Sequence, residues 1–269
     1  MRIPVLLSIK ILFTGSFIKA QDIHTPNIDS SRLHNKEAIE KPLIHKRRIQ
    51  YKSVMEGQPK SHGLFINEQR DGEWKTYYLN GQLREIGHYT KNLKEGESKT
   101  YYLNGQLRSI EKYINNKLEG EWKSYFNNQP YETGNYIAGQ KEGEWKVYHP
   151  NGQLKEIGQY SQNLKKGEWK YYRFYGIISS KGNYVDDQKK GKWKSYHKNG
   201  QLKSIGRYHK GIKKGKWKFY YANGHPKGIG RIIDGKRHGK WVEYKYDDKF
   251  RLVKFTDTYN HGIRNVEPQ

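Results

Sequence analysis

A glycine, a charged residue and a tryptophan recur together along this chain at an almost constant spacing. The steps between consecutive triplets are 24 residues, apart from one step of 23 residues. All seven tryptophans lie two residues after these glycines, and Ser98 is the only departure from the column. A fixed period of this length is typical of proteins that stack one supersecondary unit on the next. The chain therefore divides into eight repeats, numbered one to eight by their glycines Gly72, Gly96, Gly120, Gly143, Gly167, Gly191, Gly215 and Gly239.

Each repeat has the pattern of two short strands. An invariant tyrosine lies five residues after the glycine, and an Asn-Gly pair follows it in five of the repeats. A second short run then ends at another tyrosine, and neither run is long enough for a stable helix. Asn-Gly between two such runs predicts a primed turn with positive φ at both central residues. We therefore expect one β-hairpin per repeat.

A glycine also lies in the middle of the second run. It predicts either a bulge or a place where a large ring lies over bare backbone. The glycines concerned are Gly87, Gly134, Gly158, Gly182, Gly206 and Gly230.

The predicted fold class is all-β, an open repetitive meander of about eight 24-residue β-hairpin repeats that forms an elongated, twisted rod. Only 33% of the residues are hydrophobic while 14% are aromatic, so rings must supply most of the buried area. The lysine after each tryptophan should lie on the face opposite the tryptophan. There it can stack over the ring of the invariant tyrosine. The expected repeat core consists of two columns, Trp74, Trp122, Trp145, Trp169, Trp193, Trp217 and Trp241, and Tyr77, Tyr101, Tyr125, Tyr148, Tyr172, Tyr196, Tyr220 and Tyr244.

The repeat G-E-W-K-x-Y-Y-x-N-G-Q-L-x-x-I-G-x-Y resembles the MORN repeat variant, and most of all the version in bacterial YwqK-type antitoxins. The resemblance covers Gly72 to about Gly262, with a worn unit before it near His62-Gly63. It implies a hairpin rod. Related repeats occur in lipid-associated scaffolds, junction proteins, enzyme appendages and bacterial surface proteins. A toxin-neutralising, antitoxin-like or immunity-like protein is therefore an alternative function.

The two ends of the chain differ from the repeats. Residues 1–20 combine Arg2, an apolar stretch and small Ala20, which indicates a secretory signal peptide and export to the periplasm, the cell surface or the medium. An uncleaved anchor is the alternative, and a cytoplasmic location follows if no signal operates. Residues 21–60 are predicted to form a polar, poorly ordered linker, and residues 61–269 the repeat domain. The absence of cysteine excludes disulfides and thiolate chemistry.

Positive charge is concentrated in one part of the repeats. Residues 191–238 contain fourteen basic residues and one acidic residue, and so carry +13 of the net charge of +24. Such a field should attract an anionic partner, although lysines also keep an open sheet soluble. The predicted contacts are Lys192, Lys194, Lys198, Lys203, Arg207, Lys210, Lys213, Lys214, Lys216, Lys218, Lys227, Arg231, Lys236 and Arg237.

The sequence contains no pattern of a catalytic site. It has neither a Gly-x-Ser-x-Gly elbow nor a His-Glu-x-x-His motif, and its histidines are scattered. We therefore predict a non-enzymatic scaffold or binding module without cofactor or metal. Its partner is predicted to be a protein or an anionic surface such as lipid headgroups or acidic polysaccharide. Nucleic acid is a weaker candidate because the rings are needed for the core, and self-association through the sheet ends is a further possibility.

Overall fold

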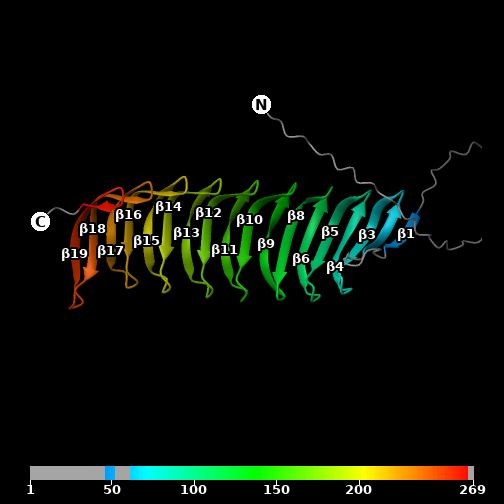
Figure 1. Ribbon diagram of the computed structural model, residues 1–269, viewed down its shortest axis with the longest axis horizontal. Helices are drawn as coiled ribbons and strands as arrows, with labels where there is room; N and C mark the ends of the chain where they lie inside the picture. Colours follow the sequence, from blue (N-terminus) through cyan, green and yellow to red (C-terminus); the bar gives the residue numbers. More distant parts are fainter. Residues whose placement is uncertain (1–45, 52–60, 266–269) are drawn as a thin grey trace, which may run out of the picture. The chain divides into compact units, whose positions relative to one another are not determined.

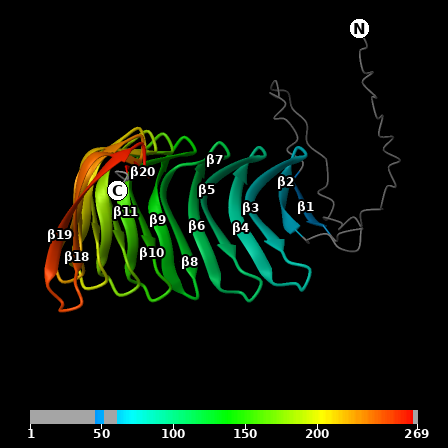
Figure 2. The ribbon, with the colours of Figure 1, turned by 60° about the vertical axis from the view of Figure 1, so that its left-hand side comes forward.

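The computed structural model describes residues 46–51 and 61–265, and this part of the chain is all-β. Its 20 strands form a single antiparallel sheet, and no described residue is helical. Strands pair in chain order, except that the short β7 and β8 both pair with β6. Figure 1 shows them following one another along the sheet, and Figure 2 shows that they are curved. The predicted open meander of hairpins is confirmed.

The strand bounds are β1 Lys46–Tyr51, β2 Ser61–Ile66, β3 Gln69–Tyr77, β4 Leu83–Thr90, β5 Leu93–Tyr101, β6 Leu107–Ile114, β7 Lys117–Leu118, β8 Gly120–Phe126, β9 Gln129–Ile137, β10 Gln140–Tyr148, β11 Leu154–Ser161, β12 Leu164–Tyr172, β13 Ile178–Val185, β14 Gln188–Tyr196, β15 Leu202–His209, β16 Ile212–Tyr220, β17 Pro226–Ile233, β18 Lys236–Tyr246, β19 Leu252–Asn260 and β20 Ile263–Arg264.

The sheet begins earlier than the predicted domain boundary at residue 61. β1 lies inside the segment predicted to be a linker, and its backbone pairs with β2 along its whole length, from Lys46 opposite Ile66 to Tyr51 opposite Ser61. The predicted signal peptide, residues 1–20, and residues 21–45 and 52–60 of the predicted linker lie outside the described residues.

Two kinds of turn alternate along the sheet, and the prediction for the Asn-Gly turn was wrong. At Asn80-Gly81 only the glycine has positive φ, 85°, and its N–H donates to the Tyr78 carbonyl at 2.9 Å. The Asn80 side chain accepts a hydrogen bond from the Gln82 N–H at 3.1 Å. Asparagine therefore holds this longer loop through its side chain, as Asx turns do, and does not need the left-handed conformation.

The primed turns lie at the other connection, where one repeat passes to the next. Gln162 and Asn163 between β11 and β12 have φ values of 51° and 68°. Two-residue loops need positive φ at both positions because only then does the turn match the twist of the paired strands. The same pattern joins β13 to β14 through Asp186 and Asp187.

The core consists of indole rings lying on glycine backbone. Six of the seven tryptophans are between 0% and 3% exposed. A Cβ placed on Gly158 would lie 2.1 Å from the Trp169 ring, and one on Gly134 would lie 1.9 Å from Trp145. The second-run glycine is therefore the place where a ring lies over bare backbone. The bulge lies on the facing strand, where the register shifts and Gly167 has a φ of +68°.

Tyrosines at the end of each second strand complete this core. Trp169 meets Tyr160 edge-on at 5.2 Å and 86°, and Tyr184 at 6.1 Å and 80°. The pattern continues with Trp193 between Tyr184 and Tyr208. Edge-to-face contact is the arrangement that aromatic quadrupoles favour. The invariant tyrosines after each tryptophan make none of these edge-on contacts and are only half-buried, so this predicted column is not part of the buried ladder.

The missing tryptophan of repeat two is matched by a missing glycine. Ser98 stands in the tryptophan column, and Glu111, directly opposite it, stands in the glycine column. Glu111 accepts hydrogen bonds from Ser109 at 2.7 Å and Tyr113 at 2.6 Å. Since Glu111 has a side chain where the neighbouring repeats have the bare backbone of Gly87 and Gly134, Trp122 is only half-buried. The aromatic core is therefore interrupted by a polar cluster between repeats two and three.

Candidate functional site

Alternation along the strands gives the sheet two faces of different chemistry. We call the side that carries the tryptophans the tryptophan face. We call the other side, which carries the residue after each repeat glycine and the lysine after each tryptophan, the lysine face. On the lysine face the register places Lys75 opposite Ile86 and Ile86 opposite Lys99, so that lysine and isoleucine alternate across the strands.

In the first five repeats the lysines of this face are ion-paired. Lys75 Nζ lies 2.9 Å from Glu73 Oε1, and the hydrogen bond raises the pKa of the lysine and lowers that of the glutamate. The pairing recurs in the next four repeats at 2.6–3.3 Å. The suggested stacking of these lysines over the invariant tyrosines is therefore not what the structure shows. The lysine turns to the carboxylate two residues away, because both side chains leave the strand on the same face.

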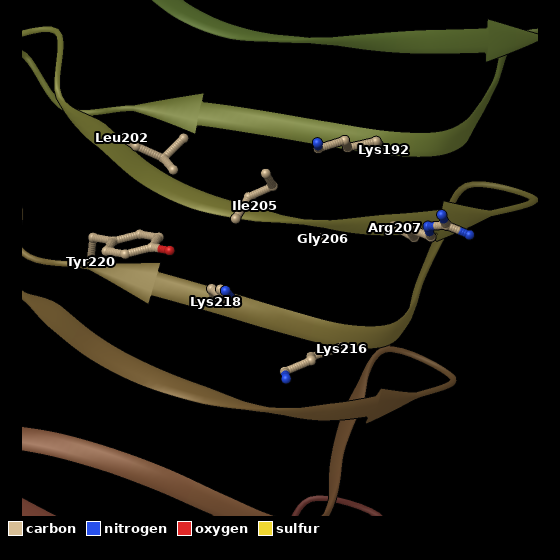
Figure 3. Close-up of a pocket in the computed structure, with 8 residues that line it drawn as sticks. All are labelled: Lys192, Leu202, Ile205, Gly206, Arg207, Lys216, Lys218 and Tyr220. Carbon is tan, nitrogen blue, oxygen red and sulfur yellow. The ribbon is translucent and has the colours of Figure 1, made fainter.

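In repeats six and seven the glutamate of this pair is replaced by Lys192 and Lys216. Arg207 of β15 lies between them, opposite Lys192 on one side and opposite Lys214 on the other. Lys194 and Lys218 both oppose Ile205. A shallow depression of about 320 Å³ lies among these side chains, and Figure 3 shows Lys192, Lys216, Lys218 and Arg207 around it.

Within the described part of the chain, none of these basic side chains has an ion-pair partner. The seven predicted contact residues on the lysine face are Lys192, Lys194, Arg207, Lys214, Lys216, Lys218 and Arg231. Their positive charge is therefore uncompensated along two consecutive repeats.

The other seven predicted contacts lie elsewhere. Lys213 and Arg237 lie over the Trp217 and Trp241 rings on the tryptophan face, at 4.7 and 4.4 Å from the ring centres. These two residues also line a groove of about 400 Å³ together with Lys203 and Lys227. Lys198 and Lys210 lie in turns, and Lys236 is the first residue of β18 after a turn. The fourteen residues therefore do not form one patch.

A column of cations lies two residues before the repeat glycine in every repeat except repeat three, and only two of its members, Lys213 and Arg237, were predicted as contacts. Lys165 Nζ lies 3.8 Å from the centre of the Trp169 ring, and Lys189 Nζ lies 4.4 Å from that of Trp193. Burial, and then the positive charges of Lys213 and Lys165, lower the pKa of Lys189. The signal in the sequence was a basic residue recurring at this position, at Arg70, Lys94, Lys141, Lys165, Lys189, Lys213 and Arg237.

The described residues contain no group of three or more histidine, aspartate or glutamate side chains that could hold a metal ion. Among these same residues there is also no helix of the length and hydropathy that crossing a bilayer requires.

The described structure is that of a β-hairpin repeat protein. A family profile described as the MORN repeat variant matches residues 70–91, 94–115, 141–162, 189–210 and 213–232. The chain therefore belongs to the MORN-variant repeat proteins. The repeats between these matches form the same paired strands, as in β12 and β13. MORN repeats are a non-catalytic repeat family and are generally associated with scaffolds that bind proteins or membranes. The bacterial YwqK-type assignment stays a prediction.

Other comparisons add little. A solved structure described as the GtfA/B complex bound to UDP and GlcNAc aligns at 15% identity over 52% of this chain and 27% of that chain, with a TM-score of 0.19. Another, of TcdB2-TccC3-TEV, aligns at 12% identity over 77% of this chain and 14% of that chain, with a TM-score of 0.15. TM-scores this low carry no argument about function. No curated protein matches the sequence.

Proposed function

We propose that this chain is a non-enzymatic binding scaffold whose lysine face in repeats six and seven docks onto a polyanionic surface. The observation that carries the proposal is the exchange of the Glu-Lys ion pair of repeats one to five for two lysines in repeats six and seven. The fold of the repeat does not require this exchange, because the tryptophan and glycine positions behind it are unchanged.

The arrangement of the charges favours an extended partner. Equivalent residues in consecutive repeats, such as Lys192 and Lys216, are two strands apart, which is about 9.6 Å. Side chains on such a row can meet many anionic groups at once but cannot enclose a single small one. Lipid headgroups and acidic polysaccharide offer charges in this form. The attraction should weaken with salt, since exposed charges are screened.

The export of the protein is also a proposal, supported by residues 1–20 alone. Under it, the docking surface would lie outside the cytoplasm. Determination of the N-terminus of the mature protein tests it, and the expected first residue is Gln21. A mature chain that keeps residues 1–20 in a soluble cytoplasmic fraction would count against export while leaving the docking proposal open.

The docking proposal is tested by giving repeats six and seven the glutamate that repeats one to five have after the repeat glycine. Lys192→Glu with Lys216→Glu should weaken binding to vesicles containing anionic lipid, and to heparin, by about tenfold or more, since each basic residue near such a surface contributes about 1 kcal/mol. Cosedimentation and the salt needed for elution from heparin measure the effect.

A matched control has the same change of net charge in the first repeats. Arg84 and Lys155 are exposed residues at equivalent positions of repeats one and four. Arg84→Glu with Lys155→Glu should change binding by less than about twofold. Equal losses in both double variants would show that only net charge matters, and the proposed docking face would be wrong.

A further inference from the structure

On the tryptophan face, half-buried lysines of the early repeats are neutralised by a carboxylate from the preceding strand. Lys165 Nζ, which lies over the Trp169 ring, is 3.3 Å from Glu156 Oε2. Lys141 Nζ is 3.0 Å from Glu132 Oε1 in the same arrangement. The chain itself therefore shows where a carboxylate binds in this environment.

Repeats six and seven keep these lysines but lack the carboxylate. The residues equivalent to Glu156 are Ser180 and Ser204, while Lys189 and Lys213 remain over their tryptophans. Neither lysine has an ion-pair partner among the described residues. A partly buried ammonium without a partner is unfavourable, because burial removes water that it would otherwise bind.

Three other departures from the carboxylate column occur among the described residues, and two of them are compensated. In repeat one the column has Ser61, and Arg70, which lies over the Trp74 ring, has no ion-pair partner in the described part of the chain. In repeat three the column has Ser109, but the lysine position is occupied by Leu118, so no charge needs neutralising. In repeat eight the column has Gly228, and Arg237 is instead paired with Glu243. Lysine without carboxylate therefore occurs at this position in two adjacent repeats of the described chain.

A second observation concerns the indole N–H of repeat seven. The Trp145 N–H donates to Glu132, and the Trp169 N–H donates to the Gln159 carbonyl at 3.2 Å. Trp217 is 2% exposed, yet its N–H has no partner among the described residues. Buried donors are normally satisfied by the protein, by water or by a ligand. Lys213 and Trp217 thus offer the two donors that Glu132 satisfies in repeat four.

The local shape of repeat seven matches that of repeat five. Trp169 stacks on Tyr171 at 6.2 Å and 29°, and Trp217 stacks on Phe219 at 5.9 Å and 23°. The rings of the two sites are therefore arranged alike. Repeat seven lacks the glutamate and, at Phe219, also the hydroxyl of Tyr171, which accepts a hydrogen bond from Lys165 at 3.4 Å.

Lys213 also opens onto the groove of about 400 Å³ on the tryptophan face. Aromatic and basic residues line the groove, among them Phe219, Tyr221, Lys203 and Lys227. The acidic residue of the groove, Glu243, forms an ion pair with Arg237 and a second, longer one with Lys245, whose Nζ lies 4.0 Å from the Glu243 carboxylate. The groove therefore combines ring surfaces with free positive charge.

We propose that the tryptophan face of repeats six and seven binds an acidic polypeptide segment in the polyproline II conformation, whose carboxylates take the places of the missing glutamates. In the proposed complex one carboxylate of the bound segment lies beside Lys213 and Ser204. The next carboxylate lies beside Lys189 and Ser180. The two sites are two strands apart, about 9.6 Å. In a polyproline II helix, residues three apart point the same way at about 9.3 Å, whereas the alternation of a β-strand offers no equally close match.

The test uses a labelled peptide of Glu-Pro-Pro repeats and the same peptide with glutamine in place of glutamate. Fluorescence anisotropy with the full chain should show binding of the first peptide only. Ser204→Glu refills the site with the chain's own carboxylate and should weaken binding by about tenfold, the usual loss when a charge-assisted hydrogen bond is removed. Ser180→Glu should act in the same direction.

Lys216→Gln is the matched control. It lowers the net charge by one, as Ser204→Glu does, but lies on the lysine face, so it should change peptide affinity by less than about twofold. Thermal unfolding of both variants shows that they fold, which is expected because Glu156 occupies the equivalent place beside Lys165.

Three results would overturn the proposal: equal affinity for the glutamate and glutamine peptides, equal losses in Ser204→Glu and Lys216→Gln, or no peptide binding. Binding of oligogalacturonate that Ser204→Glu abolishes, without peptide binding, would show that the carboxylates come from a polysaccharide and that the polypeptide assignment is wrong. Binding of vesicles and heparin by the lysine face is measured in separate experiments. The docking proposal and the peptide proposal can therefore be contradicted independently of each other.

Discussion

Repeats one to five and repeats six and seven share one backbone and differ in charge on both faces. Trp169 opposes Gly182, and Trp193 opposes Gly206, so the core is unchanged across the boundary. On the lysine face Glu168 is replaced by Lys192. On the tryptophan face the change is from Glu156 to Ser180. Two unrelated columns therefore lose their carboxylates at the same point of the chain.

The comparison teaches that the fold and the charge of this sheet are set by different residues. Rings and glycines hold neighbouring strands together, while the outward columns can change sign without disturbing them. Exposed ion pairs contribute little to stability, so their loss costs the fold little. A chain of this kind can thus carry a binding region on otherwise uniform repeats.

The largest expected effect tests whether the core is the same in both regions. Gly158→Ala and Gly206→Ala should each lower the free energy of unfolding by about 2–3 kcal/mol, because a Cβ would lie 2.1 Å from the facing indole in both. Urea unfolding followed by tryptophan fluorescence measures it.

Gly87→Ala is the matched control, because Gly87 faces Ser98 and the nearest atom to its Cβ would be 3.2 Å away. It should cost less than about 1 kcal/mol, since alanine also restricts the unfolded chain. A clear difference between Gly158→Ala and Gly206→Ala would contradict a common core.

A smaller effect is expected from moving the charge pattern into the early repeats. Glu144→Lys with Glu168→Lys removes two ion pairs and should extend the basic lysine face toward the N-terminus. Heparin elution should then need more salt, and the dependence of binding on salt should steepen by about one unit or more in the logarithmic slope. Glu144→Gln with Glu168→Gln should give an intermediate shift. Unchanged elution of the lysine variant would mean that the extended row adds no contacts.

The smallest effect concerns tyrosine titration in the two regions. Burial, and then the charge of Glu156, raise the pKa of Tyr160 from 10.0 to about 12. Burial also raises the pKa of Tyr208, which has Ser204 in place of that glutamate. A folded-state pKa above the unfolded value gives stability that is complete below about pH 10 and is lost as pH rises through the folded pKa.

Tyr160→Phe should therefore flatten the fall in stability between pH 10 and about pH 12, as measured by urea unfolding across this range. Ser204→Glu should raise the pKa of Tyr208 further, as measured by phenolate absorbance. No movement of Tyr208 would show that the introduced carboxylate does not reach the place that Glu156 occupies.

Much of the fold could be predicted because the period repeats the same physical requirement eight times. Wherever a tryptophan and a second-run glycine recur at this spacing, the pattern predicts that the indole ring packs on the bare backbone of a glycine. The turns were harder. Asn80-Gly81 carries the usual signature of a primed turn, but the five-residue loop between β3 and β4 uses the asparagine side chain as an acceptor instead.

The candidate site was predicted as a stretch of sequence, whereas the sheet divides that stretch between its two faces. Lys189 was not predicted as a contact, because the second run was expected to end before it, at Tyr184. The strand in fact starts at Gln188 and continues through the glycine, whose positive φ makes a bulge and not an end. Only this continuation brings Lys189 over the Trp193 ring.

The sequence by itself determined the hairpin period, the aromatic core and the region where positive charge accumulates, because each depends on residue type and spacing along the strand. The tertiary structure alone decided which cations share a face and which carboxylates are missing beside them. Those relations depend on the register between strands, where residues nine apart in the chain, such as Glu156 and Lys165, come into contact across a turn.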